Sequence, residues 1–193
     1  MNAPMRTPMT PESFLAWEDR QPLRHEFDGV RTIAMTGGTE AHALIQVNLA
    51  IAVGGRLRGK PCRFVGNDLK IQVDGRIRYP DGFVYCSRAQ ADRKVIDEPV
   101  VIFEVLSEST SSTDLITKNA EYAATPSVRR YVVLAQDAIG GTMFERDGED
   151  WTGRLLSADS LLRMPEIGIE VPMAEFYEGV ELAAEDHGET APE

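Results

Sequence analysis

A run of apolar residues near the centre of the chain is interrupted by one charge. Val100 to Leu106 are all apolar except Glu104. A run of this length and continuity predicts a strand that is buried on both faces. A carboxylate inside such a strand costs several kcal/mol unless a partner compensates its charge. The pattern therefore predicts a cation beside Glu104, or a Glu104 that keeps its proton.

The segment after this strand changes to a helical pattern. Ser107 to Ser112 read as a polar loop, and Thr113 is suited to cap a helix that follows it. Asp114, Lys118 and Tyr122 recur at intervals of four, which sets them on one face of that helix. A buried acid, a loop rich in hydroxyl groups and a lysine on the next helix together predict a reaction centre.

Two further helices are predicted towards the N-terminus. Met9–Asp19 has an apolar side and follows the pattern of a short helix capped by Thr10. Glu40–Arg58 shows apolar residues at helical spacing, with Thr39 as its cap, and is the longest helix that we expect.

Strands are predicted between and after these helices. Asp28-Gly29, Asp74-Gly75 and Asp147-Gly148 are turn signals, and the first two favour hairpins with two-residue turns. Arg130–Leu134 is a second apolar run, expected beside the strand of Glu104, and Leu161–Phe176 predicts one last strand and a short helix. The predicted strands are 24–27, 30–35, 62–65, 68–73, 76–79, 82–86, 100–106, 130–134, 142–146 and 150–155. The order predicts an α/β fold, bordering on α+β, with a mixed central sheet flanked by helices.

Length and charge narrow the class of protein. The chain has 193 residues, which we divide into one domain, 1–180, and an acidic tail, 181–193, expected to be disordered. The net charge is −11 and no dense basic stripe is present, which argues against tight nonspecific binding to a nucleic-acid duplex. No segment reads as a signal peptide or a membrane span, so we expect a cytoplasmic protein. Cys62 and Cys86 lack zinc-site spacing and are expected to be small core residues without a disulfide.

Asp81 is the second acid in an unusual context, because it follows Pro80 at the start of a predicted strand. Carboxylates on neighbouring strands can hold Mg²⁺, which takes one or two of them together with waters and phosphate oxygens. Lys118 would then supply positive charge to a water or to a phosphate. This set predicts hydrolysis of a phosphodiester. No GxSxG, HExxH or GxxxxGK[ST] motif supports another chemistry.

An ordered set of short motifs resembles a known family. They are TPESFLAWED, RHEFDGV, GGTEAHALIQVNL, RYPDGFV, VIFEVLSEST, DLITKNAEY and RRYVVL. In this order, between about Met9 and Val171, they resemble the Uma-type family of restriction endonucleases in the PD-(D/E)XK nuclease superfamily. The resemblance implies a restriction-endonuclease-like core, a DNA substrate, Mg²⁺ or Mn²⁺ as cofactor and often a dimer.

The resemblance also implies roles for single residues. Asp81 matches the first metal-binding acid and Glu104 the second, and the carbonyl of Val105 is expected to assist them. The superfamily usually has a lysine two residues after the second acid, where this chain has Leu106. The family displaces that lysine onto the next helix, which corresponds to Lys118. Glu26 and His42 match two further polar positions of the pocket.

Each of these residues also has an ordinary structural interpretation. Asp81 is compatible with a turn residue, Glu104 with a structural salt bridge, and Lys118 with an exposed pair to Asp114. Glu26 and His42 are compatible with surface or half-buried polar groups. For the whole protein, the alternatives are a non-catalytic binding or regulatory module on a nuclease scaffold and a hydrolase of a smaller phosphodiester.

Overall fold

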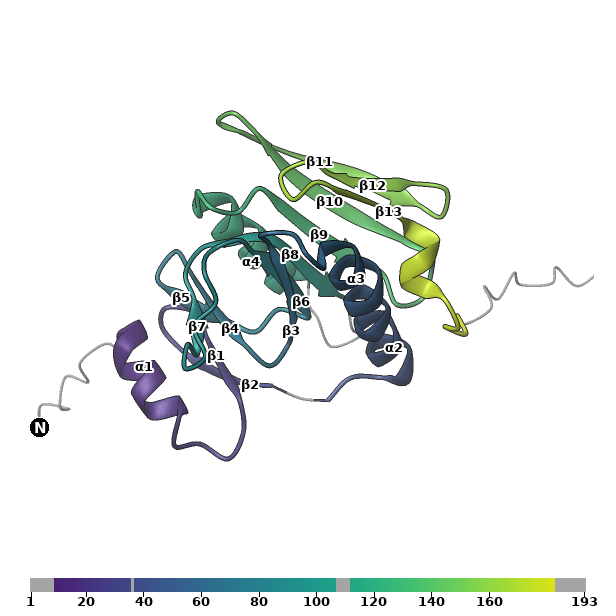
Figure 1. The fold of residues 1–193 in the computed structure, drawn as a ribbon. Coiled ribbons are helices and arrows are strands. Elements are labelled where there is room, and N and C mark those ends of the chain that lie inside the picture. The colour runs from purple at the N-terminus through teal and green to yellow at the C-terminus, as the bar shows by residue number, and fades with distance from the viewer. Residues whose placement is uncertain (1–8, 36, 107–111, 183–193) are drawn as a thin grey trace, which may run out of the picture.

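The computed structural model describes residues 9–35, 37–106 and 112–182, without the side chains of 112–114 (Figure 1). Its helices are α1 (Pro11–Glu18), α2 (Glu40–Leu49), a π-helical segment (Ala50–Gly54), α3 (Gly55–Leu57), α4 (Ser112–Ala124) and a 3-10 helix (Met173–Tyr177). The predicted helix 40–58 is therefore confirmed as a continuous helical rod, with Thr39 accepting a hydrogen bond from the amide of His42. Thr113 lies inside α4, so its prediction as the cap is wrong.

A six-stranded mixed sheet forms the centre of the protein. Its strand order is β11-β10-β9-β8-β6-β3. The strands are β3 (Arg63–Gly66), β6 (Gly82–Tyr85), β8 (Pro99–Val105), β9 (Arg130–Leu134), β10 (Gly140–Asp147) and β11 (Asp150–Ser157). β8 runs parallel to β9 and antiparallel to β6. The predicted α/β class with a mixed sheet is confirmed, and β9 lies beside the strand of Glu104 as expected.

Alternation along β8 assigns its side chains to two different layers. Val101, Phe103 and Val105 belong to the core cluster that also contains Ile45 and Leu49 of α2. Ile102 instead packs in the cluster that contains Tyr122 of α4. Because successive side chains of a strand point to opposite faces, Glu104 shares the face of Ile102 and points towards α4. This alternation fixes the direction of the acid.

A five-stranded sheet packs beside the first one. Its order is β2-β1-β5-β4-β7, with β1 (His25–Phe27), β2 (Thr32–Ala34), β4 (Lys70–Val73), β5 (Arg76–Arg78) and β7 (Val95–Ile96). α1 lies next to this sheet (Figure 1). Phe14 of α1 is fully buried against Phe27 and Ile77, so the N-terminal helix covers a small core of its own. β7 was not predicted.

The hairpin turns differ in length although each contains an Asp-Gly pair. Val73 pairs with Arg76, and both Asp74 and Gly75 have positive φ, so the predicted two-residue turn is confirmed there. In the first hairpin Phe27 pairs with Thr32, which leaves four residues between the strands. The prediction of a two-residue turn at Asp28-Gly29 is wrong. The carboxylate of Asp28 accepts hydrogen bonds from the amides of Val30 and Arg31 and so stabilises a wider turn.

Cys62 and Cys86 form a disulfide, which corrects the prediction that they are two free core thiols. The cause is strand register. β3 and β6 are antiparallel with Arg63 opposite Tyr85, so the residues before and after this pair face each other. Cys62 is buried, as expected, but Cys86 is exposed. The bond joins the ends of two neighbouring strands at the edge of the central sheet.

The C-terminal part contains one strand more than predicted. β12 (Leu161–Met164) and β13 (Ile169–Pro172) form a two-stranded sheet before the 3-10 helix. The loop 107–111 and most of the predicted tail, from residue 183, lie outside the described residues. In the part of the chain that is described, no helix has both the length and the apolar character needed to cross a membrane.

Candidate active site

Glu104 on β8 is paired with a cation from α4. Nζ of Lys118 lies 3.2 and 3.3 Å from the two carboxylate oxygens of Glu104, and the hydroxyl of Tyr122 donates to Oε1 over 3.1 Å. The side chains of Lys118 and Glu104 are only 11% and 13% exposed. The predicted cation beside Glu104 is therefore present, and burial excludes the interpretation of Lys118 as a residue on a solvated helix face.

Burial and pairing act against each other on this acid. The pKa of Glu104 is raised to about 7, because removal from water and the charges of Asp81 and Glu26 together outweigh the opposing effect of Lys118. The sequence predicted either a cation or a retained proton. The structure contains the cation, and the pKa near neutrality also favours protonation over part of the physiological range.

Asp81 is held by donors from two elements. Nε2 of Gln46 on α2 donates to its Oδ1 over 2.5 Å, and the amide of Val105 donates to its Oδ2 over 2.6 Å. Gly82 pairs with Phe103, so the same register continued by one residue sets the backbones of Asp81 and Glu104 opposite each other. The two acids come from neighbouring strands, as the sequence predicted.

His42 completes this side of the site. Its Nε2 lies 3.4 Å from Oδ2 of Asp81, and the imidazole is 14% exposed. Its hydrogen bond with Asp81 raises the pKa of His42, helped by the charges of Asp81 and Glu104 and by a hydrogen bond to the backbone of Val105. Gly38 packs so tightly on the ring that a Cβ atom there would lie 2.9 Å from Nδ1. A side chain at position 38 would thus displace the imidazole.

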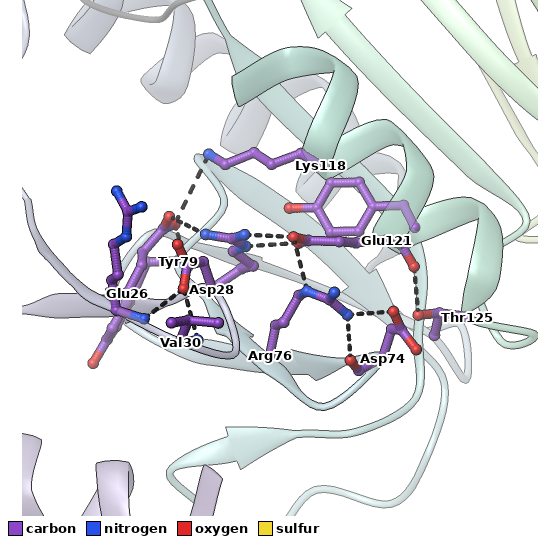
Figure 2. A network of polar contacts seen from close by, with 12 residues as sticks. Glu26, Asp28, Val30, Asp74, Arg76, Tyr79, Lys118, Glu121 and Thr125 are labelled. Atoms are coloured by element: carbon purple, nitrogen blue, oxygen red, sulfur yellow. Dashed lines mark hydrogen bonds and ion pairs between the residues drawn. The ribbon is translucent and has the colours of Figure 1, made fainter. Parts of the chain in front are cut away.

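Glu26 approaches from β1 and is also buried, with 8% exposure. Its Oε1 accepts the amide of Tyr79 over 3.0 Å, and its Oε2 accepts Arg78 over 3.1 Å. Nζ of Lys118 lies 3.9 Å from Oε1, so the lysine stands between Glu104 and Glu26. Figure 2 shows Lys118 reaching from α4 towards Glu26.

The donor set suits a hard divalent cation. Leu106 donates its amide to β9, whereas Val105 donates to Asp81, so the carbonyl of Val105 also faces the Asp81 side of β8. Two carboxylates and a carbonyl are the oxygen ligands that Mg²⁺ accepts, with waters in the remaining positions. Within the described residues no group of three or more His, Cys, Asp or Glu side chains forms a denser metal site.

All five site residues named from the sequence meet at this end of β8. Asp81, Glu104 and Lys118 form its centre, with His42 and Glu26 on either side. Sequence reasoning set Tyr122 on the helix face of Lys118 without giving it a role, and it did not name Gln46 or Arg78 as site residues. A signal existed for two of them, because Gln46 follows His42 and Tyr122 follows Lys118 by four residues on the same helix. Nothing local pointed to Arg78.

Comparisons with known proteins identify the family and the fold. The model of the Uma2 family, described as "Putative restriction endonuclease", matches residues 11–174. An uncharacterized protein of Synechocystis sp., slr1290, is 31% identical over 176 residues, which cover 89% of this chain and 93% of the relative. The crystal structure of a protein from Anabaena variabilis, described as a putative nuclease, superposes with a TM-score of 0.73 at 14% identity. The superposition covers 89% of this chain and 98% of the Anabaena chain, so the two proteins share a fold.

Proposed function

Because this chain belongs to the Uma2 family of restriction endonuclease-like proteins, we propose that it is a metal-dependent endonuclease that hydrolyses phosphodiester bonds of DNA. The observation that supports this most is the buried pair of Glu104 and Lys118 beside Asp81. A structural salt bridge needs no second acid whose charge raises the pKa of the first. Groups with shifted pKa values that cluster in this way are typical of reaction centres.

The proposal gives each residue a task. Asp81 and Glu104 would hold Mg²⁺ or Mn²⁺, together with the carbonyl of Val105. The bound ion would neutralise negative charge on the phosphate. Lys118, which donates to Glu104, would orient the attacking water or stabilise charge that develops on the phosphate. Glu26 and His42 would flank the central set, since each contacts one member of it.

The test is cleavage of single-stranded and duplex DNA by the purified protein with Mg²⁺, Mn²⁺ or EDTA. Glu104→Gln should lower the rate by about 10³-fold or more, because a ligand of the ion is lost. Glu166→Gln is the matched control, since Glu166 is 12% exposed and pairs with the buried Arg130, which by strand alternation lies on the opposite face of the central sheet from Glu104. Cleavage that continues in EDTA, or that is equal in the two variants, would refute the proposal.

A second candidate is hydrolysis of a smaller phosphodiester, and the charge of the protein favours it. A net charge of −11 repels a polyanion but hinders a small diester much less. Turnover of bis(4-nitrophenyl) phosphate without any cleavage of DNA would support this candidate. The non-catalytic module predicts neither reaction.

Assembly is a separate part of the proposal. The family resemblance implies a dimer, and sedimentation of the purified protein with and without DNA would test it. A monomer under both conditions would contradict that part alone.

A further inference from the structure

Arg78 is among the most buried side chains of the protein although it carries a full charge. It ends β5, and only 1% of it is exposed. A guanidinium cannot give up its proton in a protein, so burial requires carboxylate partners. Arg78 has two, and they come from opposite sides.

The first partner is Glu121 on α4. Nε and Nη2 of Arg78 donate to its two oxygens over 2.8 and 2.6 Å, which is the bidentate geometry that fixes direction as well as distance. Glu121 is 3% exposed and lies three residues after Lys118, on the same side of the helix. The pair therefore fixes the part of α4 that carries Lys118.

The second partner is Glu26. Nη1 of Arg78 donates to Oε2 of Glu26 over 3.1 Å, while the other oxygen of Glu26 faces Lys118 at 3.9 Å. Figure 2 shows Glu121 and Lys118 extending from α4 towards Glu26, with Arg76 at the outer edge of the same group. The guanidinium of Arg78 thus contacts α4, which carries Lys118, and also Glu26, which competes with Glu104 for Lys118.

The balance of charge explains why this matters. Among the described contacts of Lys118 are two carboxylates with little exposure, Glu104 and Glu26. Arg78 offsets the charge of Glu26, and this leaves the ammonium closer to Glu104. Without Arg78, Glu26 would attract Lys118 more strongly and draw it away from the centre.

We propose that Arg78, held by Glu121, is a positioning residue that directs Lys118 to Glu104 by neutralising Glu26. The inference rests on the proposed function for its effect on cleavage, and on geometry alone for its effect on Lys118. The competing explanation is that Arg78 and Glu121 only attach α4 to β5.

The protein contains a matched control for this test. Arg130 is also buried, with 4% exposure, and Glu166 accepts its Nε and Nη2 in the same forked geometry. It contacts none of the proposed site residues. In R78M/E121M and in R130M/E166M both charges of a buried fork are replaced by apolar groups, which in other proteins is often tolerated by the fold.

The first measurement is steady-state cleavage by the full-length protein with Mg²⁺. R78M/E121M should lower kcat by about 100-fold with little change in KM, because the lysine is displaced and binding is not. R130M/E166M should stay within about twofold of the parent. Equal activity of the two variants would overturn the inference.

The second measurement does not depend on activity. Lys118→Met is introduced into the parent and into both double variants, and thermal melting is recorded. In R78M/E121M, Lys118 is the remaining cation beside Glu26 among the described contacts, so its loss should lower Tm by about 2 °C or more beyond its effect in the parent. In R130M/E166M, Lys118→Met should lower Tm by the same amount as it does in the parent. Additive shifts in both backgrounds overturn the inference, whether or not the parent cleaves DNA.

The two proposals can fail separately. A parent that cleaves no DNA, together with the excess Tm shift, refutes the nuclease and retains the positioning role. If R78M/E121M does not fold, R78K and R130K replace the double variants. R78K keeps the charge without the fork, and kcat should then fall by about tenfold in R78K and stay within about twofold in R130K. Equal effects of the two substitutions refute the inference.

Discussion

At Glu104 the opposing effects of burial and pairing make stability depend on pH. The pKa of this acid is raised to about 7 in the folded protein, so the folded state binds the proton more tightly than the unfolded state. Binding of this proton raises the free energy of unfolding at low pH. The contribution is lost as pH rises from about 4.5, the pKa in the unfolded state, to about 7, the pKa in the folded state. In EDTA, Glu104→Gln should therefore become more stable relative to the parent by up to about 3 kcal/mol between pH 5 and pH 8.

Urea unfolding at a series of pH values measures this difference directly. Gln keeps the shape of the side chain and an acceptor for Tyr122, so the variant should remain folded. A constant difference between the two proteins across the range would mean that the folded structure does not shift the pKa of Glu104.

Gln46 orients the carboxylate of Asp81 by a hydrogen bond, and Asn48 on the same helix serves as the control for testing its effect on metal affinity. Nε2 of Gln46 donates to Asp81, whereas Nδ2 of Asn48 donates to the carbonyls of Phe176 and Glu178. Groups that orient a metal ligand typically change affinity by about 10- to 100-fold when they are removed. Gln46→Leu should weaken the apparent Mg²⁺ affinity by at least about tenfold.

Asn48→Leu should leave the Mg²⁺ affinity unchanged although it lowers stability. Both affinities follow from the dependence of Tm on Mg²⁺ concentration. Equal affinity in the parent and in Gln46→Leu would show that this hydrogen bond has no part in metal binding.

Part of the site could be identified from local patterns in the sequence. Asp81 and Glu104 stand out locally, because Asp81 follows Pro80 at the start of a strand and Glu104 interrupts an apolar run, whereas Lys118 was identified from its place on the next helix and from the family resemblance. Gln46 and Arg78 are ordinary residues of a helix and a strand, and their partners lie 35 and 43 positions away along the chain. Their roles depend on tertiary packing, which no local pattern specifies.

At the scale of elements, the disulfide between β3 and β6 should contribute to stability but not to the site. It joins the C-terminal end of β6, whereas Asp81 precedes the N-terminal end. Closing a loop with a sequence separation of 24 residues stabilises by about 3.5 kcal/mol in the chain-entropy estimate. C62S/C86S should lower the free energy of unfolding by about this amount, and reduction of the parent should have the same effect.

Urea unfolding with and without reductant is the measurement, with DNA cleavage recorded beside it. Cleavage should be unchanged at temperatures where both proteins are folded. No difference in stability between oxidised and reduced parent would contradict the prediction.

Elements with a strong hydrophobic period were predicted best. β8, β9 and the helix from residue 40 follow from their apolar patterns, since burial alone decides them. Turn length and cysteine pairing were predicted less well. The wider turn after Phe27 depends on where the Asp28 carboxylate finds donors, and the disulfide depends on the register of two strands. Neither turn length nor cysteine pairing can be predicted from the residues of a single segment.

For the whole molecule, the negative net charge means that an anionic substrate is repelled from the site. The net charge is −11, and the centre itself contains the carboxylates of Glu104 and Glu26 beside Lys118, with the charge of Asp81 acting on Glu104. A phosphate would approach such a centre against repulsion unless a cation is bound first. A bound ion is therefore expected to be a condition for substrate binding as well as for chemistry.

A Mg²⁺ titration followed by thermal melting tests this central claim most directly. A cation that binds a preformed site at 100 times its Kd stabilises by about 2.7 kcal/mol, which raises Tm by roughly 5 to 10 °C in a chain of this size. We expect a saturable rise of this order in the parent and in Glu166→Gln, and none in Asp81→Asn or Glu104→Gln. A parent without a saturable shift, or variants that shift as the parent does, would contradict it.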